Sequence, residues 1–273
     1  MKGPLIKDIT IGQYFPGSSV LHRMDSRIKI ILTAVFIVML FAAKDIAALA
    51  VGILFTLVTF LISKIPLKMM GKSLKPIIPL IIFTALLNLF FIRSGELLWQ
   101  WRFIKITDQG IDTSVFMVIR IICLICGTSL LTYTTSPIDL TDAIERLLSP
   151  LKKIKVPVHE LAMMMTIALR FIPTLIEETD KIMSAQKARG ADMETGSLIQ
   201  KAKAMVPILI PLFVASFRHA EELALAMECR CYHGGEGRTR MKQLKLSMID
   251  LYGSLFTAAF LASVIAVNIL MKK

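Results

Sequence analysis

Five apolar segments, each long enough or nearly long enough to cross a lipid bilayer, constrain the fold of this 273-residue chain more than any other feature. A span takes about twenty apolar residues, and fewer where flanking lysines or arginines reach the interface. Lipid offers no hydrogen-bond partner to the backbone, so such spans fold as helices. The predicted spans are 28–43, 46–63, 77–92, 111–135 and 249–271. The sequence therefore predicts an all-α integral membrane protein with about five transmembrane helices.

Composition and charge support a membrane protein and argue against a nucleic-acid-binding protein. Hydrophobic residues make up 55% of the chain and charged residues 19%, whereas about a quarter of the residues in a soluble domain are charged. The net charge is +12, but basic and aromatic residues are not interleaved as they are in proteins that stack on bases. We therefore expect no nucleic-acid partner, and we assign the surplus of Lys and Arg to the flanks of membrane helices.

The short loops predict the orientation. Lys64, Lys68, Lys72 and Lys75 lie between the second and third spans with no acidic residue among them, which marks this loop as cytoplasmic. The N-terminus and the long segment before the last span then also lie in the cytoplasm. Five spans would leave the C-terminus outside. We expect a multi-pass protein of the cell membrane.

More than half of the chain's charged residues fall in 136–248, between the fourth and fifth spans. Apolar residues recur there at helical spacing, which predicts three amphipathic helices: one from about 137 to 150, and longer ones over 158–189 and 198–231. Helices that are half apolar and half charged are typical of a cytoplasmic or interfacial domain. The predicted organisation is 1–135 with four spans, 136–248 as the cytoplasmic helical domain and 249–273 as the last span.

The two long helices of this domain end in similar charged tips. The stretch 180–191 (DKIMSAQKARGA) aligns with 221–232 (EELALAMECRCY), so that Arg189 corresponds to Arg230. An arginine at a helix C-terminus can serve as a cap that interacts with the helix dipole. Two such arginines in matched contexts favour a second interpretation, in which each guanidinium projects into a groove on a partner protein.

The spans themselves carry little chemistry. Arg120 is the one charge well inside a predicted span, and it either marks a functional site or extends to the outer interface. No G-x-x-x-x-G-K-[ST] loop, Ser/His/Asp set or H-E-x-x-H motif occurs in the sequence. The membrane part is therefore predicted to be a non-catalytic scaffold.

Three motifs, in order along the chain, resemble those of a known family. They are ALRFIPTLIEETDKIMSAQKARGAD (168–192), SFRHAEELALAMECRCY (216–232) and GRTR (237–240), and the N-terminal GQYFPGSSVLHRMDSRIK (12–29) is also similar. Together they resemble the transmembrane T component of energy-coupling factor transporters, which are ATP-driven importers of vitamins and metal ions in bacteria and archaea.

The resemblance implies a set of partners and contact residues. The T component joins two cytoplasmic ABC ATPases, identical or different, to one or more S components, small membrane proteins that capture the substrate. ATP and Mg belong to the ATPases, and no cofactor is expected on this chain. The helices of 136–248 become coupling helices, whose tips dock on the ATPases through Ala188, Arg189, Gly190, Cys229, Arg230 and Cys231. The second tip departs from the family's Ala-Arg-Gly pattern, since cysteines replace both small residues beside Arg230.

The apolar faces of the long helices are the expected contact with the S component, through Met163, Met164, Ile167, Leu209 and Phe213. Methionine-rich surfaces repack easily, which suits a hub with several partners. Two alternatives remain open. One is a conventional ABC permease with its own substrate path, and the other is a membrane enzyme with a metal bound by Cys229, Cys231 and His233.

Overall fold

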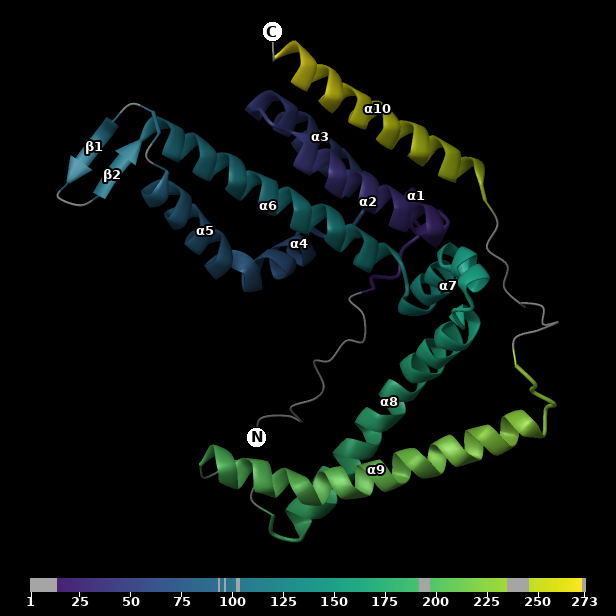
Figure 1. Ribbon diagram of the computed structural model, residues 1–273. Coiled ribbons are helices and arrows are strands. Elements are labelled where there is room, and N and C mark those ends of the chain that lie inside the picture. Colours follow the sequence, from purple (N-terminus) through teal and green to yellow (C-terminus); the bar gives the residue numbers. More distant parts are fainter. Residues whose placement is uncertain are drawn as a thin grey trace. The chain divides into compact units, whose positions relative to one another are not determined.

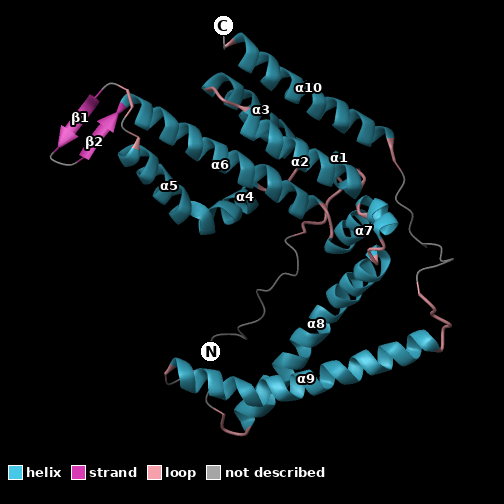
Figure 2. Ribbon diagram, in the orientation of Figure 1, coloured by secondary structure: helices cyan, strands magenta, loops and turns pink. Residues whose placement is uncertain are grey.

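The computed structural model describes residues 14–92, 94–95, 97–101, 104–191, 197–234 and 246–271. Within these ranges the chain is almost entirely helical (Figure 2). Contacts divide it into two units, 12–143 with 243–273, and 1–11 with 144–242. The first unit is called here the membrane unit and the second the long-helix unit. The three-part organisation predicted from the sequence, including which parts face the cytoplasm, stays a prediction.

The membrane unit contains α1 to α6, a short hairpin, the first part of α7, and α10 (Figure 1). The bounds of its elements are Val20–Arg23 (α1), Ser26–Ala42 (α2), Ile46–Ser63 (α3), Leu67–Leu74 (α4), Ile78–Phe91 (α5), Leu97–Trp101 (β1), Ile104–Thr107 (β2), Asp108–Thr134 (α6), Pro137–Leu147 (α7) and Met248–Leu270 (α10). A 3₁₀ turn, Lys75–Ile77, joins α4 to α5. The antiparallel hairpin β1–β2 lies between the predicted spans 77–92 and 111–135.

The core of the membrane unit forms where α2, α3, α6 and α10 pack together. Phe36, Met39 and Leu40 from α2 are buried there with Leu49 and Phe55 from α3. The rings of Phe36 and Phe55 stack with their centroids 5.4 Å apart. Gly127 of α6 lies directly against Phe36, so close that a side chain at position 127 would collide with its ring. The absence of a side chain there lets α6 approach α2.

The long-helix unit contains the end of α7, a 3₁₀ segment Ser149–Ile154, and two helices of 31 residues each, α8 (Val158–Ala188) and α9 (Leu198–Glu228). Ser197 begins α9 with a capping box, in which its side chain and that of Gln200 bond each other's backbone amides. These bounds agree closely with the three helices expected from the periodicity. Helices α8 and α9 pack against each other where His219 lies beside Phe171 and Glu178, and they cross (Figure 1).

Six helical segments in the described part are long and apolar enough to span a membrane by length and composition. They are α3, α4 with α5, α6, α8, the part of α9 from Ala202, and α10. The set differs from the five predicted spans in two ways. Helix α2, predicted as the first span, is not among the six and has only 17 residues. Helices α8 and α9 were not predicted as spans but are among the six, at a mean hydropathy of 1.3 against 2.0–2.5 for the other four. The cytoplasmic placement of α8 and α9 stays a prediction.

Candidate functional site

The tips of α8 and α9 share one backbone geometry. At the end of α8 the amide of Gly190 donates to the carbonyl of Lys187 over 3.0 Å, and that of Ala191 donates to Gln186 over 3.0 Å. At the end of α9 the amide of Cys231 donates to Glu228 over 2.9 Å, and that of Tyr232 donates to Met227 over 3.1 Å. This paired pattern is the Schellman motif of helix C-termini. The two arginines therefore occupy equivalent positions, each directly before the residue that reverses the chain.

That reversing residue is left-handed in both tips. Gly190 has a φ of 84° and Cys231 a φ of 54°. Glycine adopts this region freely, whereas a residue with a β-carbon pays for it. Cys231 nevertheless takes a left-handed conformation like that of Gly190 in the first tip, so the loss of the glycine does not change the backbone motif.

The side chains at both tips are exposed. Ala188, Arg189, Gly190, Cys229, Arg230 and Cys231 all lie on the surface. Neither arginine forms an ion pair within the described residues, and the helix-end carbonyls of Gln186, Lys187, Met227 and Glu228 are bonded by backbone amides. These hydrogen bonds cap both helices, so each guanidinium is left for another contact.

The apolar residues expected to face a membrane partner divide by exposure. Met164, Leu209 and Phe213 are 54%, 43% and 63% exposed, while Met163 and Ile167 are half-buried. His219 lies 3.4 Å from Glu178 on α8 and 3.6 Å from Glu222 on its own helix.

Arg120 has a clear structural role. Its Nη2 atom donates to the carbonyl of Ala43, just past the end of α2. The guanidinium lies 4.5 Å from the centroid of the Phe116 ring and 5.9 Å from that of Phe41. Asn268 of α10 completes the arrangement by donating to Ala42 and accepting from the amide of Lys44. Arg120 therefore binds the α2–α3 turn, where a cation complements the C-terminal end of the helix dipole.

A buried polar cluster in the membrane unit was missed by the sequence analysis. Asp250 at the start of α10 is 3% exposed and accepts from the amides of Asp25, over 2.8 Å, and Ser247, over 2.7 Å. Lys29 of α2 is 7% exposed and donates to the carbonyl of Thr134 over 2.9 Å. The cluster ties together the starts of α2 and α10 and the end of α6. The pattern Ser247-x-x-Asp250 is a capping-box signal that marks the helix start but not the distant contact with Asp25.

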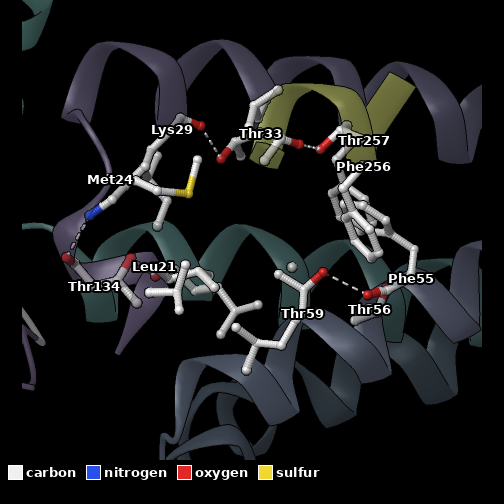
Figure 3. Close-up of a pocket in the computed structure, with 18 of the residues that line it drawn as sticks. Leu21, Met24, Lys29, Thr33, Phe55, Thr56, Thr59, Thr134, Phe256 and Thr257 are labelled. Atoms are coloured by element: carbon white, nitrogen blue, oxygen red, sulfur yellow. Dashed lines mark hydrogen bonds between the residues drawn. The ribbon is translucent and has the colours of Figure 1, made fainter. Parts of the chain in front are cut away.

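The membrane unit also contains a cavity of about 370 Å³ among α1, α2, α3, α6 and α10 (Figure 3). Five threonines line it, and each hydroxyl donates to a carbonyl of its own helix: Thr33, Thr56, Thr59, Thr134 and Thr257. The Lys29 amine is bonded to Thr134 and Thr135. The wall therefore consists mainly of methyl groups and rings such as those of Phe36, Phe55 and Phe256.

Comparison with known proteins identifies the family. A family model described as cobalt transport protein, CbiQ, matches residues 17–241. Curated proteins named energy-coupling factor transporter transmembrane protein EcfT are similar over nearly the whole chain. The one from Ruminiclostridium cellulolyticum is 54% identical across 96% of this chain and 97% of its own length. The chain belongs to the EcfT family.

Two further EcfT relatives extend the comparison. The protein from Clostridium kluyveri is 57% identical over 92% of this chain and 93% of its own, and that from Bacillus subtilis is 48% identical over 88% and 91%. The resemblance inferred from the sequence motifs is thereby confirmed. As an EcfT-family protein with several apolar helices, the chain is a multi-pass membrane component of a transporter.

Proposed function

We propose that this chain is the scaffold of an importer that couples ATP hydrolysis on two cytoplasmic ABC ATPases to the movement of a substrate-binding S component. Arg189 and Arg230 each bind one ATPase, and the ATPases carry ATP and Mg. The cargo is a micronutrient, a vitamin or metal ion, chosen by the S component. The importer lies in the cell membrane of a bacterium or archaeon, with the N-terminus and the long-helix unit in the cytoplasm.

The observation that carries this proposal is the equivalence of the two tips. Two helices that end in the same backbone motif present the same exposed side chain, which suits a partner that comes in two similar copies. Arginine is enriched among the residues that dominate interfaces, because its planar fork of donors matches carboxylates and carbonyls. A pair of ATPases with similar grooves fits this arrangement.

Movement of the ATPases then reaches the membrane through α8 and α9. Helices of 31 residues are each about 46 Å long at 1.5 Å per residue. A shift at an arginine tip therefore displaces a long apolar face. In this proposal Met163, Met164, Ile167, Leu209 and Phe213 lie on the faces that contact the S component.

The cavity favours this function over a permease with its own substrate path. A site for a vitamin needs a few well-placed polar groups. In the cavity the threonine hydroxyls and the Lys29 amine are already bonded within the protein. A metal-dependent enzyme would need a cluster of metal ligands. In the described part of the chain, no group of three or more His, Cys, Asp or Glu side chains is able to hold an ion, and this gives the alternative no support.

A co-purification experiment tests the proposal. The tagged chain is extracted from its native membrane in mild detergent, as wild type and as the double variant Arg189→Ala/Arg230→Ala. We expect two nucleotide-binding subunits and small membrane proteins with the wild type, and loss of the ATPases by more than about tenfold in the variant, as for residues that dominate an interface.

The matched control is Arg170→Ala/Arg218→Ala, which removes the same charge from exposed positions within α8 and α9. This control should retain the ATPases. Undiminished ATPase recovery with the tip variant would refute docking through the arginines, and recovery of the chain without any ATPase would refute the proposed assembly.

A further inference from the structure

Helix α4 carries a row of lysines on one side. Lys68, Lys72 and Lys75 follow one another at intervals of four and three residues, which places them on one face of the helix. Lys64 precedes them at the end of α3, and all four lysines are exposed. These four residues are called here the lysine row.

The opposite side of α4 is fixed to the membrane unit. Met69 and Met70 pack against a buried cluster of Phe60, Ile65, Leu130 and Tyr133. The Tyr133 hydroxyl donates to the carbonyl of Met69 over 2.9 Å and is also hydrogen-bonded to Ser73. Because these contacts prevent rotation of α4 about its axis, the lysine row is held facing away from the protein.

No acidic residue close to the lysine row in the sequence can neutralise its charge. The sequence has no acidic residue between Asp45 and Glu96. None of the four lysines belongs to an ion pair within the described residues. Such a concentration of unpaired positive charge requires a negatively charged partner or bulk water.

The position of α4 in the chain indicates which negatively charged partner the lysine row would bind. It lies between two apolar helices, α3 and α5, and Figure 1 shows α4 bent away from the direction of α5. Pro76 lies within the 3₁₀ turn that joins them. Leu67 is 70% exposed, so α4 presents an open apolar residue together with its lysines. Lysines beside an exposed apolar residue at the end of a span are typical of a segment that lies in the membrane interface.

We propose that the lysine row binds the phosphate headgroups of anionic phospholipids, with Leu67 inserted among their acyl chains. This site is independent of the proposed ATPase docking. Each lysine near an anionic membrane surface contributes about 1 kcal/mol, which corresponds to about fivefold in affinity. The site would give α4 a defined depth at the point where the chain passes from α3 to α5.

The test is a lipid titration of the purified full-length chain in neutral detergent, read by native mass spectrometry. The probes are dioleoyl-phosphatidylglycerol and, for comparison, dioleoyl-phosphatidylcholine. We expect the wild type to retain phosphatidylglycerol preferentially, and to lose this preference between about 0.15 M and about 1 M salt as charges are screened. The variant Lys64→Gln/Lys68→Gln/Lys72→Gln/Lys75→Gln should bind phosphatidylglycerol at least about tenfold more weakly.

Two further variants make the result specific. Replacing the same four lysines with arginine keeps the charge and should keep the affinity within about twofold. Replacing Lys152, Lys153, Lys155 and Lys181 with glutamine removes as much charge from exposed positions in the long-helix unit and should leave lipid binding unchanged.

Two results would overturn the proposal. The first is unchanged lipid binding by the glutamine variant of the lysine row; if this variant also loses the co-purifying ATPases, the lysine row is assigned to an acidic protein surface instead. The second is an equal loss in the control, since binding would then follow total charge.

Discussion

The two units of the molecule differ in how much of their apolar surface they bury themselves. In the membrane unit, side chains from four helices form a closed core that includes Phe36, Met39, Leu40 and Val264, each at most 3% exposed. In the long-helix unit, α8 and α9 have 31 residues each, yet the buried apolar residues described on them are only Val158, Ala162 and Ile208. Internal contacts thus define the shape of the first unit, while most of the apolar surface of α8 and α9 is left exposed.

The sharpest way to test this difference is to truncate one phenylalanine in each unit. Phe36→Ala removes a ring that is 3% exposed, and we expect a loss of about 3–5 kcal/mol in the free energy of unfolding. Phe213→Ala removes a ring that is 63% exposed and should change it by less than about 0.5 kcal/mol. Thermal unfolding of the isolated chain in detergent measures both. Equal losses would show that α9 is packed within the chain as tightly as α2.

A second test compares buried and exposed carboxylates. Asp250→Ala leaves the amides of Asp25 and Ser247 without a partner in a buried site, which we expect to cost about 1–3 kcal/mol of stability. Asp250→Asn keeps an acceptor oxygen and should cost less. In the long-helix unit, Glu222→Ala removes an exposed partner of His219 and should cost less than about 0.5 kcal/mol. The same unfolding measurement applies, and a harmless Asp250→Ala would mean that the polar cluster does not hold α2 and α10 together.

Most of the helical elements were predictable because their signals are local. Long apolar runs identified α3, α5, α6 and α10, and the serine caps at Ser197 and Ser247 mark where α9 and α10 begin. The charged tips were also found from the sequence, since each is a short pattern on one helix. The equivalence of the two tips could be recognised only from the backbone conformation, because the sequence does not predict that Cys231 adopts a positive φ.

The features that were missed depend on contacts between distant residues. Asp25 and Asp250 are 225 positions apart, and Lys29 reaches Thr134 across 105. The target of Arg120, the carbonyl of Ala43, lies 77 positions away. A single sequence contains each of these polar residues but does not show which residues they contact, so the role of Lys29 was not predicted and Arg120 was left between two interpretations.

The smallest expected effect concerns the residue that reverses the chain after each arginine, which is Gly190 in the first tip and Cys231 in the second. Cys231 holds a left-handed conformation that glycine adopts without strain, so Cys231→Gly should preserve the Schellman motif and ATPase binding. Cys231→Val places a β-branched residue there and should disturb the tip by about 1 kcal/mol or more, weakening ATPase binding about fivefold. Cys229→Val, at a helical φ of −59°, is the matched control. Faster amide exchange at Tyr232, whose N–H bonds to Met227, reports the change without any ATPase. Equal effects from both valine variants would show that the side chains, and not the reversed backbone, determine how Arg230 is presented.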